Sequence, residues 1–164
     1  MKKLVLMLML IAPLTAFAQK FGEVDMDAVA QVLPEFSKAQ GDLQAMAKQA
    51  DNELNEMSQE IQRQFETYQK QASTMNATAK TEAENKIQEL QVKFEEARQQ
   101  KAADLQKAQQ EKLAPIQTKV QKAIENVGNN GGYTFIALKG SFPFVGKNLT
   151  DVTEACKTEV LKIK

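Results

Sequence analysis

The sequence contains no histidine and no tryptophan, and it has a single cysteine among its 164 residues. Histidine is the commonest general base and metal ligand, so its absence removes the usual centre of acid–base and metal chemistry. The glycine-rich segment 128–132 lacks the lysine and hydroxyl residue of a phosphate-binding loop. The cysteine has no histidine that could activate it as a nucleophile. We therefore expect no enzyme activity, no catalytic residue, no metal site and no cofactor.

A single cysteine also excludes a disulfide within the molecule. We interpret Cys156 as a buried small apolar residue, and a reactive thiol or an intermolecular disulfide is the alternative. Without a disulfide, stability has to come from packing and from association between copies.

The first 18 residues differ from the rest of the sequence. Two lysines follow Met1, residues 4–17 are almost wholly apolar, and Ala16-Phe17-Ala18 has the small-x-small pattern of a cleavage site. This arrangement predicts a secretory signal peptide over residues 1–18. The apolar run is short for a membrane span, which needs about 20 residues, and an uncleaved anchor is the alternative. We therefore treat residues 19–164 as one exported domain.

Neither sign of charge is in clear excess. Residues 19–164 hold 19 lysines and arginines against 21 acidic residues, a net charge of −2. Binding to nucleic acid phosphates requires a basic surplus or patch. The balance therefore argues against a nucleic acid partner.

Glycine and proline are almost absent from residues 35–127, which contain only Gly41 and Pro115. The segment is rich in Gln, Glu, Lys and Ala, which favour helix. Its apolar residues recur in four-three steps, which predicts a coiled coil with one stutter across Ile61. The first row is Leu43, Ala47, Ala50, Leu54, Met57, Ile61, Phe65, Tyr68, Ala72 and Met75, and a second row begins at Ala83 and Ile87.

Between the two rows lies a polar stretch, Ser73–Ala79, that favours turns over helix interiors. A reversal here predicts a long antiparallel helical hairpin with its tip near 73–80, with Thr78 or Thr81 as the cap of the second helix. One continuous helix is the alternative. The fold class we expect is therefore mainly α.

Residues 19–34 and 128–164 are predicted to form a small β-containing base for this hairpin. Strands are expected at 21–25, 133–138 and, at an edge because of Pro143, 142–145. Gly128–Gly132 is expected to end the second arm, and Thr153 to cap a closing helix over 154–163. A thin hairpin on so small a core predicts an oligomer. The expected interface residues are Phe21, Val24, Tyr133, Phe135 and Ile136.

Four short motifs follow one another along the sequence: Phe21–Met26, Val32–Phe36, Gly132–Ile136 and Asp151-Val152-Thr153. In this order they resemble the Skp/OmpH-like family of periplasmic chaperones. The first resembles the first strand of that family, the second the start of its first arm, the third the strand after the hairpin, and the fourth the start of the last helix. The likeness covers residues 19–164.

This resemblance implies a homotrimer in which strands of three subunits form a shared β-body, with helical arms protruding around a cavity. It implies a periplasmic, ATP-independent holdase that binds unfolded outer-membrane β-barrel proteins. Well-known family members are strongly basic, whereas this protein is near neutral. Its net charge therefore does not support electrostatic capture of clients or contact of the arm tips with the membrane.

Large apolar side chains on the arms are the expected client contacts, because methionine suits adaptable surfaces. The alternative is that these residues form the seam between the two helices. They are Met46, Met57, Phe65, Tyr68, Met75 and Phe94. The alternative function is a structural spacer or tether of the cell envelope that binds no client.

Overall fold

The computed structural model describes residues 19–163, so the predicted signal peptide lies outside the described residues. The protein divides into two units. Residues 19–29 and 122–163 form the strand unit, and Ala30–Gln121 form the helical unit.

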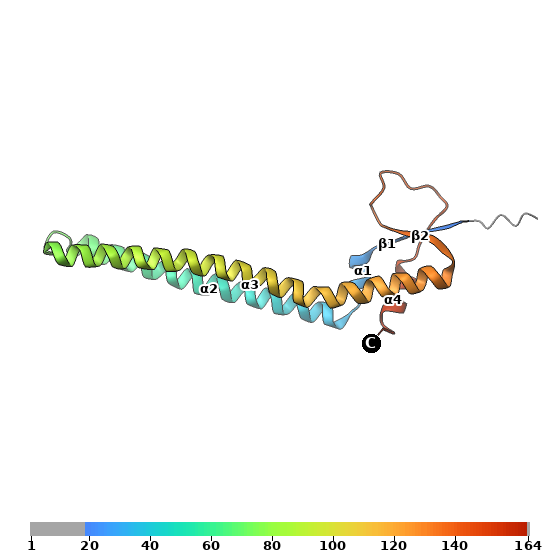
Figure 1. Ribbon diagram of the computed structural model, residues 1–164, viewed down its shortest axis with the longest axis horizontal. Coiled ribbons are helices and arrows are strands. Elements are labelled where there is room, and N and C mark those ends of the chain that lie inside the picture. The colour runs from blue at the N-terminus through green and yellow to red at the C-terminus, as the bar shows by residue number, and fades with distance from the viewer. Residues whose placement is uncertain (1–18, 164) are drawn as a thin grey trace, which may run out of the picture. The chain divides into compact units, whose positions relative to one another are not determined.

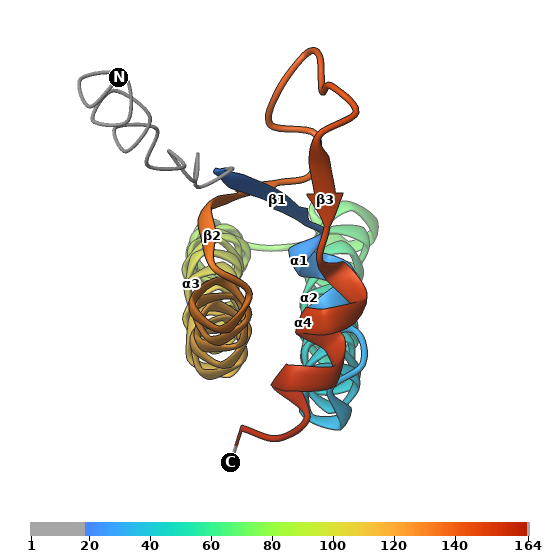
Figure 2. The same cartoon turned by 90° about the vertical axis from the view of Figure 1, so that its right-hand side faces the viewer.

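The helical unit consists mainly of two long helices that run side by side in opposite directions (Figures 1 and 2). Helix α2 spans Pro34–Gln71 and α3 spans Ala77–Gly131, the last ten residues of α3 belonging to the strand unit. Pro34 stands at the start of α2, where a missing backbone N–H costs nothing. The predicted hairpin is therefore confirmed, and one continuous helix is excluded.

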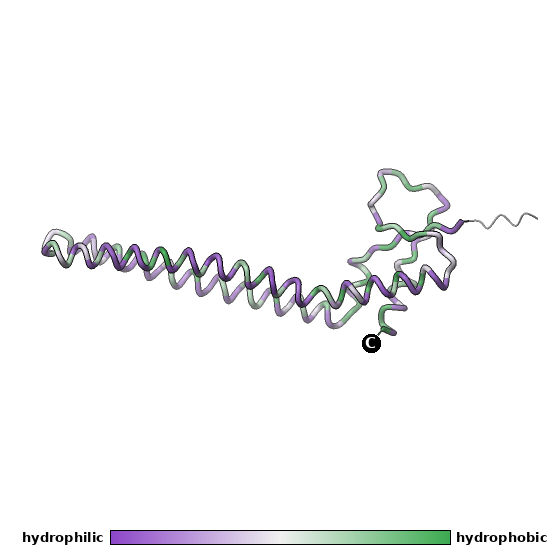
Figure 3. Tube along the Cα trace, viewed as in Figure 1, coloured by the Kyte–Doolittle hydropathy of each residue, from purple (hydrophilic) through white to green (hydrophobic). Residues whose placement is uncertain are grey.

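The apolar rows predicted for the two helices lie mostly at their mutual face, and hydropathy alternates along both arms (Figure 3). Ile87 is buried, and most other row members are half-buried. Phe65 is an exception, since it is 47% exposed while Gln64 takes the half-buried position. The two successive four-residue steps therefore fall after Gln64, and their prediction across Ile61 was wrong.

The reversal between the arms occupies residues 72–76. The Oδ1 atom of Asn76 accepts the backbone N–H of Ala79 at 2.8 Å, which caps the first turn of α3. Thr81 instead donates its hydroxyl to the Ala77 carbonyl, so the prediction of a threonine cap was wrong. Asn76 is the cap because it lies one residue before the helix, where its side chain reaches the free N–H groups of the first turn.

Three ion pairs join α2 to α3 and fix the register of the hairpin. Glu35 pairs with Lys119 at 2.7 Å, Asp42 with Lys112 at 2.8 Å, and Glu53 with Lys101. Each step of seven or eleven residues along α2 matches an equal step back along α3. The lysine hydrogen bond lowers the pKa of the acid in each pair.

The strand unit contains a three-stranded parallel sheet in the order β2-β1-β3 (Figure 2). Strand β1 spans Lys20–Val24, β2 spans Tyr133–Leu138 and β3 spans Leu149–Asp151. A short helix α1, Met26–Ala30, follows β1, and α4, Thr153–Val160, follows β3. Because β1 is central, the outer edges of β2 and β3 have no partner strand among residues 19–163.

Helix α3 runs to Gly131, so the prediction that the segment Gly128–Gly132 ends the second arm is confirmed, with Gly128 and Gly131 still inside the helix. A Cβ on Gly131 would lie only 2.7 Å from the Cδ2 atom of Tyr133, and one on Gly128 would touch Ile136 at 3.4 Å. These glycines therefore permit close packing against β2. Gly132, with a φ of 67°, is the residue that ends the helix.

Two further predictions for the base need correction. Residues 142–145 are not a strand but part of an exposed loop, and the third strand is Leu149–Asp151. Thr153 does not cap α4 with its side chain, because its hydroxyl accepts the backbone N–H of Asp25 at 3.0 Å. The Asp151 carboxylate accepts the Thr153 N–H instead.

Candidate functional site

One face of the sheet is packed inside the strand unit. Gly22 is paired with Ile136 in the sheet, and a Cβ at Gly22 would lie 3.1 Å from Ile136 and 3.2 Å from the Tyr133 ring. Val24, on the same side of β1 as Gly22, is 1% exposed. The core here also includes Val29, Ala123, Val152, Cys156 and Val160, all buried.

The opposite face of the sheet presents aromatic rings. Phe21 of β1 and Phe135 of β2 pair across the strands, with ring centroids 4.9 Å apart at 41°. Phe135 is 47% exposed. We call the hollow beside them the aromatic cleft. It has a volume of about 210 Å³ and is lined by Phe21, Phe135, Phe142, Phe144, Val145, Gly146, Asn148 and Leu149.

The loop between β2 and β3 supplies the other aromatic rings of the cleft. Phe144 is 83% exposed, and Phe142 and Val145 are also exposed. Isolated exposed apolar side chains are ordinary on a protein surface, but several gathered around one hollow make the aromatic cleft a candidate interaction site.

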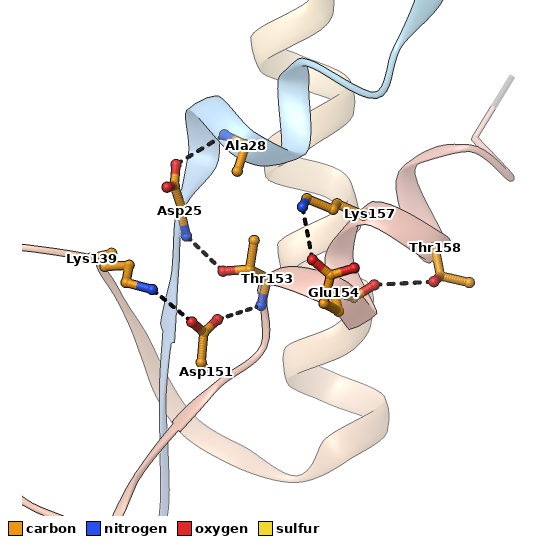
Figure 4. Close-up of polar contacts among 8 residues, drawn as sticks. All are labelled: Asp25, Ala28, Lys139, Asp151, Thr153, Glu154, Lys157 and Thr158. Atoms are coloured by element: carbon orange, nitrogen blue, oxygen red, sulfur yellow. Dashed lines mark hydrogen bonds and ion pairs between the residues drawn. The ribbon is translucent and has the colours of Figure 1, made fainter.

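A polar network holds the two ends of this loop together (Figure 4). Lys139, just after β2, pairs with the Asp151 carboxylate at the end of β3 at 2.8 Å. The second carboxylate oxygen accepts the Thr153 N–H at 2.9 Å. These bonds lower the pKa of Asp151 to about 2, with Lys139 as the main cause. The network also reaches β1, because the Thr153 hydroxyl accepts the Asp25 N–H.

The five predicted interface residues therefore fall on two faces. Phe21 and Phe135 lie at the aromatic cleft, whereas Val24 and Ile136 belong to the packed face, and Tyr133 lies over Gly22 and Gly131. Sequence reasoning missed Phe142, Phe144 and Val145 as surface residues. Their signal was the apolar run between Gly140 and Gly146, which was interpreted as a strand.

The predicted client contacts on the arms also differ in exposure. Met46 and Phe65 are exposed, at 38% and 47%. Met57, Met75 and Phe94 are half-buried, which is typical of the seam between the helices. Tyr68 is half-buried too, and its hydroxyl donates a hydrogen bond to Glu84 of α3. Val92 is a further exposed apolar residue that sequence reasoning missed.

The described residues contain no metal-binding cluster, and their one cysteine is buried. Within residues 19–163 there is no group of three or more acidic or cysteine side chains that could hold a metal ion. Cys156 is fully buried, and burial raises the pKa of its thiol to about 11. The interpretation of Cys156 as a buried apolar residue is confirmed.

The sequence profile described as "Outer membrane protein (OmpH-like)" matches residues 20–160, which include both arms and nearly all of the base. The chain belongs to the OmpH-like family. No curated protein matches it in sequence. An OmpH-like fold is also found in a crystal structure of a candidate outer membrane chaperone from Caulobacter crescentus. That structure matches with a TM-score of 0.72 and 11% identity over 89% of this chain and 86% of the other.

Proposed function

We propose that this OmpH-like protein is an ATP-independent holdase of the periplasm, which keeps unfolded outer-membrane β-barrel proteins from aggregating. The observation that carries the proposal is the family match across the helical hairpin and the strand unit together. The solved structure with the same fold is described as a chaperone of the outer membrane. A holdase needs exposed apolar surface to which a client can bind, and it needs no catalytic groups. The arms provide such surface at Met46 and Phe65.

Export is the first part of this proposal. The signal peptide over residues 1–18 would direct the protein across the inner membrane and would be removed there. Among residues 19–163, no helix is long and apolar enough to cross a membrane. The working form would then begin at Gln19.

Assembly through the strand unit is the second part, with a homotrimer as the expected state. The aromatic cleft supports this because Phe135, Phe142 and Phe144 expose large apolar area that a second copy could cover. The interface would contain Phe21 and Phe135 from the predicted set, while Val24 and Ile136 would support it from the packed face.

The loop that carries Phe142 and Phe144 would change on assembly. Among residues 19–163, its β-favouring run, Phe142–Val145, pairs with no strand, while β2 and β3 each present an open outer edge. Open edges invite strands of another copy. Residues 142–145 would therefore pair with the edge of a neighbouring copy, and Pro143 would restrict that pairing to one side of the new strand.

Client binding is the third part, and it would use the arms. An unfolded β-barrel strand exposes an apolar face in water. Met46 and Phe65 are the most accessible of the predicted contacts, while Met57, Tyr68, Met75 and Phe94 would contribute only their exposed edges. Each contact would be weak, so release would need no nucleotide, only a more stable site in the membrane.

The test is an aggregation assay without nucleotide. A urea-denatured outer-membrane β-barrel protein is diluted into buffer with and without the exported protein, and light scattering is followed. Suppression at sub-micromolar concentrations of the exported protein supports the holdase. Unchanged scattering would favour the alternative, a structural spacer or tether of the envelope.

Two double variants test whether the client binds to the arms. The double variant Met46→Ser with Phe65→Ser removes two exposed apolar side chains and should weaken suppression several-fold. The control pair, Gln44→Ser with Gln69→Ser, changes exposed polar residues of the same helix and should leave suppression unchanged. Equal helical circular dichroism of wild type and both double variants would show that the arms are intact.

A further inference from the structure

We propose that the exported protein has a pyroglutamyl residue at its N-terminus, formed from Gln19. The proposal rests on the export described under the proposed function. Removal of the signal peptide after Ala16-Phe17-Ala18 makes Gln19 the first residue, with a free α-amine. No part of the chaperone proposal uses this residue.

The chemistry needs only atoms that Gln19 itself contains. Its α-amino nitrogen attacks the carbon of the side-chain amide, and the new C–N bond closes a five-membered lactam. The original C–N bond of that amide breaks. The leaving nitrogen departs as ammonia after taking up the proton that the attacking amine loses. No oxidant, reductant or cofactor takes part, so the step is balanced within one residue.

The surroundings of Gln19 leave this reaction unobstructed. Gln19 is exposed and precedes the first strand residue, so its backbone takes no part in the sheet. Among residues 19–163, the Gln19 side-chain amide has no hydrogen-bond partner that would hold it away from the α-nitrogen. An exposed terminus is also open to any enzyme that catalyses the closure.

The fold begins immediately afterwards and does not depend on the free amine. Lys20 pairs with Tyr133 in the sheet, and its Nζ atom donates to the Gly131 carbonyl at 3.1 Å, at the end of α3. Ring closure consumes the amine of Gln19 and leaves the Lys20 N–H and side chain unchanged. The modified protein should therefore have the same sheet and the same thermal midpoint.

Cyclisation would remove one positive charge at the start of β1. A free α-amine has a pKa of about 7.7–8.0 and is mostly protonated at neutral pH, whereas a lactam nitrogen is neutral. The product would resist aminopeptidases, which require a free amine. Stability against trimming would then protect Lys20, whose ammonium group supports the end of α3.

The experiment is intact-mass spectrometry of the full-length protein, expressed with its leader and recovered from the cell envelope at neutral pH. The expected mass is that of residues 19–164 less one ammonia. Treatment with pyroglutamyl aminopeptidase should then make Lys20 the first residue in N-terminal sequencing. The matched control is Gln19→Asn, whose side chain is one methylene shorter and would have to close a strained four-membered ring.

Each outcome is decisive. A wild-type mass of residues 19–164 with ammonia retained, and a terminus open to sequencing, would overturn the modification while leaving export intact. A mass that includes the leader, or that begins at another residue, would overturn the cleavage site on which the modification depends. Neither result touches the aggregation assay, so failure of this inference is separable from failure of the chaperone proposal.

Discussion

The Phe21 and Phe135 rings lie 4.9 Å apart on neighbouring parallel strands and form the floor of the aromatic cleft. Such a pair contributes about 0.5–1.5 kcal/mol beyond its buried area. Within one copy nearly half of Phe135 remains exposed to water. The cleft is therefore the surface at which association between copies can be tested.

Phe135→Asp should dissociate the assembly, because association would bury a carboxylate with no partner. Sedimentation velocity should show the mass fall from that of the oligomer to that of one subunit. Val92→Asp is the control, since Val92 is about as exposed as Phe135 but lies on α3 in the helical unit, and it should leave the mass unchanged. An unchanged mass for the Phe135 variant would refute assembly through the cleft.

The helical hairpin could be predicted from the sequence because the spacing of its apolar residues repeats many times along both arms. Four-three spacing repeats along both arms, so a local ambiguity changes little. The misplaced Phe65 shows the limit. Either Gln64 or Phe65 continues a row of this period, and packing between the helices decides for the shorter polar side chain. The large ring is left outside, where it becomes a candidate client contact.

The base was harder to predict, because its features depend on contacts between distant segments. Gly128 favours a helix end locally, yet α3 continues to Gly131 and ends only where Gly132 adopts a φ of 67°. Phe142–Val145 has the composition of a strand but pairs with neither open edge of the sheet among residues 19–163. Local propensity indicates which secondary structure a segment favours. Whether a strand forms also depends on a neighbouring strand that it can pair with in the folded protein.

Asn76→Ala should destabilise the arms by about 1 kcal/mol, because the side-chain bond to the Ala79 N–H is lost at the start of α3. Urea unfolding followed by helical circular dichroism measures the change. Asn52→Ala is the matched control, since Asn52 is exposed inside α2 and should gain a few tenths of a kcal/mol from better helix propensity. Equal midpoints for the two variants would argue against a cap at Asn76.

Gly132→Ala should cost about 1 kcal/mol, although no atom lies within 4 Å of the added methyl group. The cost comes from the backbone, because a φ of 67° is strained for a residue with a Cβ. Gly146→Ala is the control, because it also meets open space but has no positive φ. Thermal unfolding should separate the two variants. Gly132→Asn should recover part of the loss, since asparagine tolerates this conformation.

Acid should weaken the strand unit through Asp151. Its pKa is lowered to about 2 by the Lys139 hydrogen bond and then by Thr153, against an ordinary value of about 3.9 in the unfolded state. A carboxyl whose pKa is depressed by folding stabilises the protein above its unfolded pKa. That contribution is lost as the pH falls from about 5 to 2, when the folded state has to take up a proton.

Because the Asp151 side chain is 44% exposed, solvent screens the ion pair and its net contribution should stay below about 1 kcal/mol. The measurement is the difference in unfolding free energy between wild type and Asp151→Asn as a function of pH. Asparagine keeps an oxygen for the Thr153 N–H but carries no charge. The difference should be constant above about pH 5 and should shrink towards pH 2. A difference that does not change with pH would mean that Asp151 acts through shape and neutral hydrogen bonding, and not through its charge.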